Sequence, residues 1–452
     1  MYQIFTGKLA DGVLSDVKWG KNGTGTEGTA VESTVLEALM AVDGKSDTEK
    51  LAVITDYANL NEGNKFGTVT NGSPLDVPTG YYLIKDVDGV FAGKDEVYTT
   101  YIVEIVEDVT INPKADKTTS DKTVTDVEDS TGKIESGQLG ADFDIGDKVP
   151  FELKATIGDG YEDYKSYKLV FHDTLSESLS FNTDSVVVKL NGTEITTGYY
   201  IVNENTNDGC TFEVVFDNLK NVPGVASGSV ITVEYTAELK ENAAIGGHGN
   251  MNKLHVEYSN NPNEGHETET GNTPEDIVVV FTYKVTVNKV DEKGEPLTGA
   301  EFTLEKLIKG ENGATDTWKP ITVVNNNAGT SFTFSGLDDG QYRLSETKTP
   351  DTYNSIEPIY FTISASHDGS KIVTLIGDQT SQSGTKLEGD AITAAFTSST
   401  TDGSLSTNVE NNKGATLPET GGVGTTLFYV IGGILMVGAI VLLIAKKRMN
   451  AE

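Results

Sequence analysis

Apolar and polar residues alternate along most of the chain, and this alternation predicts β-strands. Because successive side chains of a strand point to opposite faces, residues two apart share one face. Strand-like runs fill residues 149–262 and residues 278–413, and Gly, Asn, Asp and Ser separate them at short intervals. This spacing is typical of β-sandwiches. The pattern therefore predicts a mostly β protein.

The opening of the chain mixes helix and strand patterns. Apolar residues recur at helical spacing between Val31 and Met40, and a second helix is expected from Glu49 to Leu60. β-like runs follow as far as Ile111. The polar stretches 115–135 and 261–276 are expected to be linkers.

The last part of the chain differs from the rest. An uncharged stretch from Gly422 to Ala445 precedes Lys446-Lys447-Arg448. At about 1.5 Å per residue, this stretch is long enough to cross a bilayer core of about 30 Å. The basic residues behind it favour the cytoplasmic side. We therefore expect a C-terminal transmembrane helix.

These patterns divide the 452 residues into three tandem Ig-like β-sandwich domains, the first with added helices, and a C-terminal segment. The expected boundaries are 1–114 for the N-terminal domain, 115–272 for the middle domain, 273–414 for the third domain and 415–452 for the membrane segment.

Composition narrows the possible functions. A net charge of −34 argues against nucleic acid as a partner and against binding of the domains to an anionic membrane surface. Cys210 is the only cysteine, so no intramolecular disulfide can form. Met1-Tyr2-Gln3 enters a strand-like run at once, without a secretory leader. We expect that the chain is truncated at its start.

Polar residues continue apolar faces on three strands of the third domain. Lys289 follows Tyr283, Val285 and Val287; Glu346 follows Tyr342 and Leu344; Asn411 follows Val409. Burial of an unpaired ammonium costs several kcal/mol, lowers the pKa of a lysine and raises the pKa of a carboxyl group. A neutral amine beside an amide and a protonated acid can expel ammonia and form a Lys–Asn isopeptide bond.

The same segments resemble a known family. Lys289-Val290-Asp291, Leu297-x-Gly299-Ala300-x-Phe302-x-Leu304, Tyr342-x-Leu344-x-Glu346-Thr347 and Pro350 are similar to a CnaB-like domain. The resemblance implies a bond between Lys289 and Asn411, assisted by Glu346. Asn408 and Asn412 are nearby alternatives, but Asn411 has the favoured strand parity and stands in the family's Val-x-Asn-x-Lys ending.

The middle domain repeats this theme. Tyr167, Leu169, Phe171 and Asp173 share a face, as do Leu254, Val256, Tyr258 and Asn260. Both segments resemble the middle domain of pilus backbone subunits. The resemblance implies that Asp173 is the assisting acid and Asn260 the acceptor. Lys122 is the expected donor, with Lys117 and Lys133 as alternatives.

Two further motifs concern attachment to other molecules. Leu417-Pro418-Glu419-Thr420-Gly421 resembles the cell-wall sorting signal of Gram-positive surface proteins, which a sortase cleaves between Thr and Gly. The opening domain resembles the first domain of a pilus subunit, and Val109 to Lys114 partly matches the motif whose lysine attacks the sortase-bound threonine. Asn112 replaces the usual tyrosine and Ile105 the usual upstream tryptophan.

The resemblance implies a structural role. It indicates the backbone subunit of a covalent pilus, joined from Thr420 to Lys114 of the next copy by a polymerising sortase and attached to peptidoglycan by a housekeeping sortase. Such a pilus supports adhesion at the cell surface. A monomeric wall-anchored adhesin and a tip or basal pilin that binds a host ligand remain alternatives.

Nothing in the sequence predicts an enzyme, a cofactor or a metal site. The five histidines are scattered, and no Ser-His-Asp arrangement, P-loop or dinucleotide fingerprint is present. Asn203, Asn205, Asn207 and Asp208 are expected to form a polar hairpin tip rather than a calcium loop.

Overall fold

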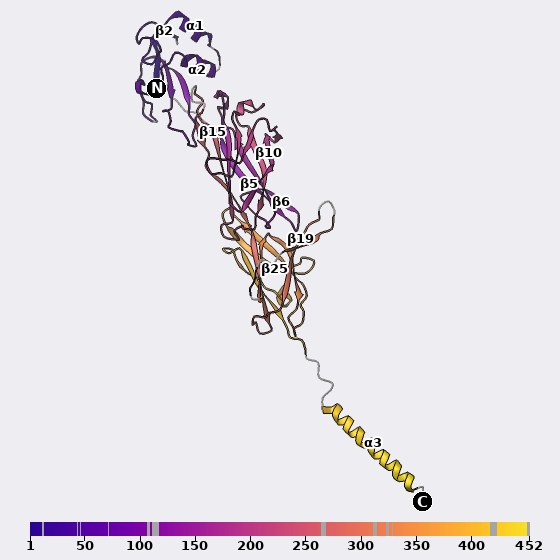
Figure 1. Ribbon diagram of the computed structural model, residues 1–452. Helices are drawn as coiled ribbons and strands as arrows, with labels where there is room; N and C mark the ends of the chain where they lie inside the picture. The colour runs from indigo at the N-terminus through magenta and orange to yellow at the C-terminus, as the bar shows by residue number, and fades with distance from the viewer. Residues whose placement is uncertain are drawn as a thin grey trace.

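A computed structural model gives the fold. It describes residues 1–10, 13–42, 44–45, 47–70, 72–105, 109–110, 117–263, 268–310, 314–321, 325–327, 329–415 and 423–449. Three β-rich blocks lie end to end (Figure 1), which confirms the predicted mostly β class and the tandem arrangement. Helix α3 (Val423–Met449) contains an apolar segment, Leu427–Met449, long enough to cross a membrane.

The first block consists of a four-stranded antiparallel sheet and two helices. The sheet order is β2-β1-β3-β4, formed by β1 (Tyr2–Ala10), β2 (Val13–Trp19), β3 (Gly80–Lys85) and β4 (Thr100–Ile105). Helices α1 (Ser33–Ala41) and α2 (Asp47–Thr55) and the 3-10 helix η1 (Glu62–Asn64) lie between β2 and β3. Both helices contribute to the core around Trp19. The first helix was predicted correctly, and the second ends earlier than predicted.

The middle block is a β-sandwich, as predicted. One sheet has the order β11-β10-β14-β8-β5-β6: β5 (Thr119–Glu128), β6 (Lys133–Gln138), β8 (Lys148–Thr156), β10 (Leu179–Leu190), β11 (Thr193–Glu194) and β14 (Val230–Leu239). The other has the order β12-β13-β9-β15-β17-β7: β7 (Gly140–Asp142), β9 (Leu169–Leu175), β12 (Ile201–Asn203), β13 (Phe212–Phe216), β15 (Asn250–Ser259) and β17 (Asp276–Phe281), with β16 (Thr270–Asn272) beside β15. The 3-10 helices are η2 (Tyr161–Asp163) and η3 (Leu219–Asn221).

Two strands of this block lie where the sequence suggested linkers or another domain. β5 occupies much of the expected linker 115–135, because its inward residues Lys122 and Val124 alternate with polar residues that face outward. β17 pairs with β15 and β7, although the expected boundary placed its residues in the third domain. The first strand that pairs within the sheets of the third block is β18, which begins at Tyr283, and Val279 and Phe281 of β17 also pack into that block's core.

The third block is a second sandwich of two five-stranded sheets. One has the order β21-β22-β18-β27-β26: β18 (Tyr283–Asp291), β21 (Asn325–Asn327), β22 (Ser331–Leu337), β26 (Thr397–Ser399) and β27 (Ser404–Asn411). The other has the order β20-β19-β23-β24-β25: β19 (Glu301–Ile308), β20 (Thr317–Ile321), β23 (Gly340–Lys348), β24 (Ile359–His367) and β25 (Ile372–Thr380), and η5 (Gly389–Ala391) follows. The first and last long strands, β18 and β27, are parallel neighbours.

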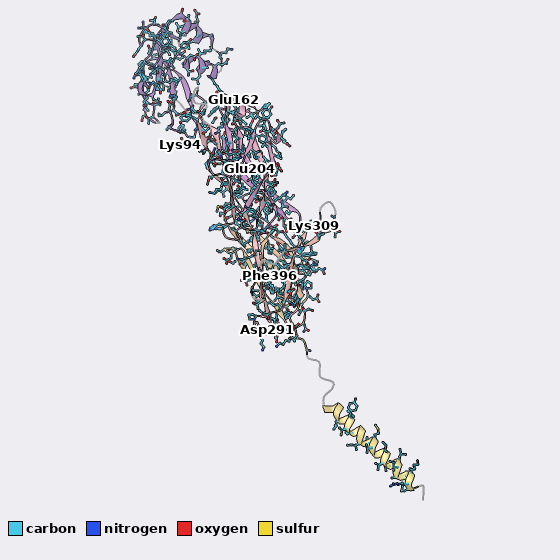
Figure 2. All side chains as sticks on the ribbon, in the orientation of Figure 1. Lys94, Glu162, Glu204, Asp291, Lys309 and Phe396 are labelled. Atoms are coloured by element: carbon cyan, nitrogen blue, oxygen red, sulfur yellow. The ribbon has the colours of Figure 1, made fainter. Side chains whose placement is uncertain are left out.

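A buried lysine joins the middle and third blocks. The Nζ atom of Lys306 donates hydrogen bonds to Asp129 at 3.2 Å, Asp144 at 2.9 Å and Asp338 at 3.0 Å. The adjacent Lys309, labelled in Figure 2, donates its backbone N–H to the carbonyl of Asp129 at 2.8 Å. Burial acts to lower the pKa of Lys306, but Tyr342 and the surrounding aspartates raise it well above its usual value.

Acidic side chains outnumber basic ones at this junction. Burial and the neighbouring Asp142 raise the pKa of Asp126 to about 7 and that of Asp339 to about 8. Burial and the nearby Asp144 raise the pKa of Asp147 to about 6. His367 faces Asp142 at 3.4 Å, and although burial opposes it, this contact raises the pKa of His367.

We predict that the protein becomes more stable as the pH falls from 8 to 5. A group whose folded-state pKa is raised contributes most stability below its unfolded value and loses that contribution as pH rises through its folded value. Aspartates with pKa values of about 6 to 8, and His367, all act in this direction. The measurement is the melting temperature of the purified protein across this pH range.

Asp339→Asn tests the contribution of one of these aspartates to the pH dependence of stability. It should raise the melting temperature at pH 8, by about 2–4 °C for each kcal/mol recovered, and change it little at pH 5. Asp351→Asn, at an exposed position of the same block, should have no effect at either pH. A wild-type melting temperature that rises from pH 5 to pH 8 would contradict the prediction.

Candidate cross-linking sites

Lys289 points into the core of the third block. It ends the inward face that Tyr283, Val285 and Val287 begin on β18, and it is fully buried. Its Nζ atom donates to the backbone oxygens of Val290 at 2.8 Å and Val409 at 3.0 Å. An ammonium has three N–H donors, whereas a neutral amine needs only two acceptors. Burial lowers the pKa of Lys289, against the opposing effect of Glu346, and so favours the neutral amine.

Glu346 and Asn411 meet beside this amine. β27 runs parallel to β18, so that Lys289 lies opposite Val409 and Asp291 lies opposite Asn411. The Asn411 Nδ2 atom donates to the two carboxylate oxygens of Glu346 at 2.9 and 3.1 Å. The Asn411 Oδ1 atom is buried and has no hydrogen-bond partner in the part of the chain that the structure describes. Asp291, labelled in Figure 2, marks this end of the block.

The two alternative asparagines lie outside this cluster. Asn408 and Asn412 are both exposed, because strand parity turns them away from the core. Asn408 accepts a hydrogen bond from Asn288 at 3.3 Å instead. The geometry therefore leaves Asn411 as the amide next to Lys289 and Glu346.

The middle block contains a second buried lysine. Lys122 on β5 crosses the sandwich and donates to the carboxylate of Asp173 on β9, and both side chains are fully buried. The Lys122 Nζ atom also lies 5.6 Å from the ring centre of Phe151 and 5.9 Å from that of Tyr235. Burial lowers the pKa of Lys122 and raises the pKa of Asp173, and each group opposes the shift in the other.

Asn252 is the amide that completes this second cluster. The Tyr235 hydroxyl donates to Asp173 Oδ1 at 3.0 Å, and Asn252 Nδ2 donates to the Tyr235 oxygen at 2.6 Å. Asn252 is fully buried, and its Oδ1 atom has no hydrogen-bond partner within the described residues. On the paired strands, Asn252 lies opposite Leu175, next to the pair of Leu254 and Asp173.

The structure contradicts the expected position of Asn260 beside Lys122. Asn260 lies six positions beyond Leu254, the residue opposite Asp173, which is about 20 Å at about 3.3 Å per residue. Its amide donates to the backbone oxygens of Phe91 at 2.9 Å and Glu96 at 3.0 Å. Asn260 thus joins the middle block to the first block.

The alternative donors Lys117 and Lys133 are also excluded from the buried cluster. Lys117 forms an ion pair with Asp95 and keeps 44% of its side chain exposed. Lys133 pairs with Glu135 and is 61% exposed. Both side chains remain in contact with solvent, unlike the buried side chains of Lys122 and Asp173.

Sequence reasoning missed Tyr235 and Asn252. The sequence pattern could have indicated both residues, since Tyr235 belongs to the alternating run 230–239 and Asn252 shares the parity of Leu254 and Val256.

The residues expected to attach the chain to other molecules are outside the described residues. They are Leu417, Pro418, Glu419, Thr420, Gly421 and Lys114. Ile105 is the last residue of β4.

Comparison with known families identifies the parts of the chain. Residues 145–262 match the Gram-positive pilin backbone subunit 2, Cna-B-like domain. Residues 283–379 match a prealbumin-like fold domain, and residues 409–451 match the LPXTG cell wall anchor motif.

The chain is similar to a T6 surface protein in sequence and to a solved T6 pilin in structure. The trypsin-resistant surface T6 protein of Streptococcus pyogenes serotype M6 is 28% identical over 339 residues, and the match spans 61% of this chain and 60% of that protein. The solved T6 backbone pilin of serotype M6 Streptococcus pyogenes has a TM-score of 0.53 at 20% identity, covering 92% of this chain and 95% of the pilin. That structure is described as a modular three-domain pilin, which agrees with the fold.

These matches define the class of protein first: a surface protein of Gram-positive type that carries a cell-wall anchor. The domain content is more specific. Residues 145–262 match a pilin backbone domain, and the predicted cell-wall location is confirmed by the anchor motif and the apolar helix behind it.

Proposed function

We propose that the chain is the backbone subunit of a covalently polymerised pilus. The single observation that carries the proposal is that a pilin backbone domain and an LPXTG anchor occur on one chain. The end-to-end arrangement of the three blocks supports it, because an elongated subunit extends a fibre efficiently (Figure 1).

Polymerisation needs an activated acyl group and an amine. A sortase thiolate attacks the Thr420 carbonyl, the bond to Gly421 breaks, and the chain remains attached as a thioester. The ε-amine of Lys114 from a neighbouring copy then attacks this thioester and releases the sortase thiol. The final subunit is transferred in the same way to an amine of peptidoglycan.

Within the third block, we propose an isopeptide bond between Lys289 and Asn411. The neutral amine attacks Asn411 Cγ, a new C–N bond forms, and the bond to Nδ2 breaks. Glu346, which contacts Nδ2, returns a proton to the departing nitrogen, so ammonia leaves and no redox partner is required.

The same reaction is proposed in the middle block, with Asn252 as the acceptor in place of Asn260. Lys122 supplies the amine, and Asp173 carries the proton from the amine to the leaving nitrogen. Tyr235 is a positioning residue, because its hydroxyl connects Asp173 to the amide of Asn252.

The position of the proposed Lys289–Asn411 bond suits a domain that is pulled at its two chain ends. β18 opens the third block and β27 closes it, and the two strands are adjacent and parallel. A bond between Lys289 and Asn411 carries force from one end of the block to the other without stretching the fold between them. This supplies the covalent reinforcement that a chain with one cysteine cannot obtain from disulfides.

We predict that the purified wild-type protein is lighter than its sequence by two ammonia molecules. Glu346→Gln and Asp173→Asn should each restore the mass of one ammonia. A cross-link that closes a loop of roughly 100 residues contributes about 4–5 kcal/mol in the chain-entropy model, so each variant should melt about 10–20 °C lower. Intact-mass spectrometry and thermal melting measure both effects.

Asn252→Ala and Asn260→Ala form the matched control pair on one strand face. The first should restore one ammonia, and the second should leave the wild-type mass unchanged. The reverse result would return the acceptor role to Asn260, and an unmodified wild-type mass would refute both internal bonds.

We predict that boiled, detergent-treated wall extracts contain a ladder of high-mass polymers. Thr420→Ala should remove both the ladder and wall attachment, because no acyl-enzyme forms. Lys114→Ala should collapse the ladder to monomer but leave the monomer on the wall. An immunoblot compares the three strains.

Two other results of the immunoblot would change the interpretation. A ladder that persists in Lys114→Ala would assign the linking amine to another lysine. A wild-type strain that shows only wall-attached monomer would refute the backbone role and indicate a singly anchored surface protein.

A further inference from the structure

Four side chains that offer a nitrogen, a sulfur and two carboxylate oxygens converge at one edge of the middle block. His172 lies on β9, Glu213 lies on β13, and Asp208 and Cys210 lie in the hairpin between β12 and β13. We propose that these four residues bind a divalent transition-metal ion of the zinc class. The proposal is independent of pilus assembly and of the internal cross-links.

The spacing of the ligand atoms fits a single ion. One atom from each residue lies within 4.8 Å of the others. The His172 Nδ1 atom is 2.8 Å from Asp208 Oδ2, 3.5 Å from Glu213 Oε1 and 3.9 Å from Cys210 Sγ. Tetrahedral zinc with bonds of about 2.0–2.3 Å places its ligand atoms about 3.3–3.7 Å apart. The contact of His172 with Asp208 is shorter than this range, and its contacts with Glu213 and Cys210 lie within it or close to it.

The donor set selects the class of metal. Imidazole nitrogen and thiolate sulfur suit zinc and neighbouring transition metals, whereas calcium and magnesium prefer oxygen ligands alone. Cys210 is the only cysteine of the chain, and it is buried at this site. The thiolate rather than the thiol is the metal ligand, so binding of the ion would displace a proton from Cys210.

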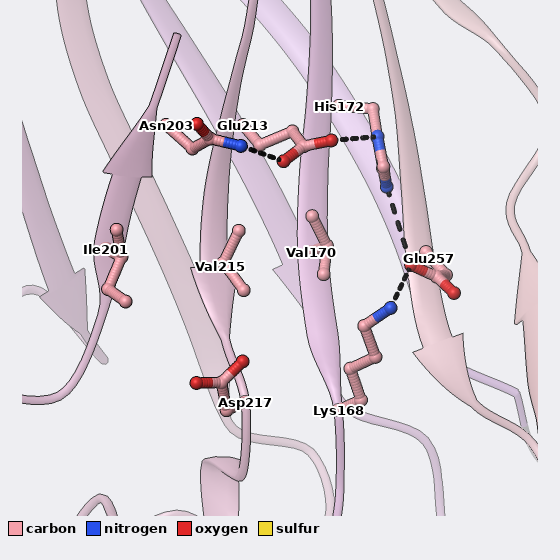
Figure 3. A pocket seen from close by; sticks show the side chains of 9 residues that line it. All are labelled: Lys168, Val170, His172, Ile201, Asn203, Glu213, Val215, Asp217 and Glu257. Atoms are coloured by element: carbon pink, nitrogen blue, oxygen red, sulfur yellow. Dashed lines mark hydrogen bonds and ion pairs between the residues drawn. The ribbon is translucent and has the colours of Figure 1, made fainter. Parts of the chain in front are cut away.

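Supporting contacts hold both carboxylates while leaving one oxygen of each for the ion. Figure 3 shows Asn203 donating to Glu213 at 2.8 Å through Oε2, which leaves Oε1 toward His172. The backbone N–H of Cys210 donates to Asp208 Oδ1 at 3.0 Å, which leaves Oδ2. Each carboxylate therefore presents one oxygen to the same point.

The imidazole is oriented in the same manner. His172 Nε2 faces Glu257 Oε2 at 3.6 Å, and Lys168 donates to that oxygen at 2.7 Å, as Figure 3 shows. A carboxylate behind the second ring nitrogen of a metal-binding histidine fixes the tautomer that offers the first nitrogen as a ligand. His255 stacks on the ring, with centroids 4.6 Å apart, and limits its rotation. Because Asp208 is exposed, the ion can enter from solvent.

Titration of the full chain, purified in detergent with a non-chelating reductant, tests the proposal. Co²⁺ is the probe, because a cobalt–thiolate bond gives a charge-transfer absorbance band and tetrahedral cobalt absorbs in the visible. We expect both signals to saturate at one equivalent, to be displaced by Zn²⁺ and to resist excess Ca²⁺.

Variants separate this site from other acidic clusters. Cys210→Ser should abolish the charge-transfer band, Asp208→Asn should weaken cobalt binding at least tenfold, and Glu257→Gln should weaken it about 10–100-fold. His248→Ala, at an exposed position of the same block, should bind as wild type does. Absence of the thiolate band in the wild-type protein, or a band that persists in Cys210→Ser, would overturn the proposal.

Discussion

Burial of lysine inside a β-sandwich is the constraint on which the rest of this structure depends. Lys122 and Lys289 are almost completely removed from water, on strand faces that are otherwise apolar. A charged ammonium in such a place costs several kcal/mol unless other groups compensate. Each sandwich provides one acid and one amide next to the lysine. The arrangement favours loss of the charge, and a neutral amine beside an amide is a nucleophile in reach of its target.

Lys306 shows that burial alone does not create such a site. It is as deeply buried as Lys289, but three aspartates surround it and raise its pKa well above its usual value. The lysine therefore stays charged and holds two blocks together by ion pairs. The groups around each lysine decide its chemistry. One acid and one amide favour attack of the neutral amine on the amide, whereas several carboxylates keep the lysine charged.

Strand parity made much of this predictable from sequence. A period of two places Lys289, Glu346 and Asn411 on buried faces, and the structure brings these three residues together. Parity does not give the position along a strand, so Asn252 and Asn260 were equivalent in the sequence although they lie at different ends of the same face. The polar composition of β5 hid a strand whose inward residue is Lys122. His172 and Cys210 are far apart in the chain, so only the pairing of β9 with β13 reveals their proximity.

We propose that the chain is a fibre subunit strengthened by covalent bonds inside its middle and third blocks. Peptide mapping of the wild-type protein by tandem mass spectrometry tests this claim most directly. We predict two branched peptides, one joining Lys122 to Asn252 and the other joining Lys289 to Asn411, each lacking one ammonia. Recovery of all four residues in unmodified linear peptides would contradict it.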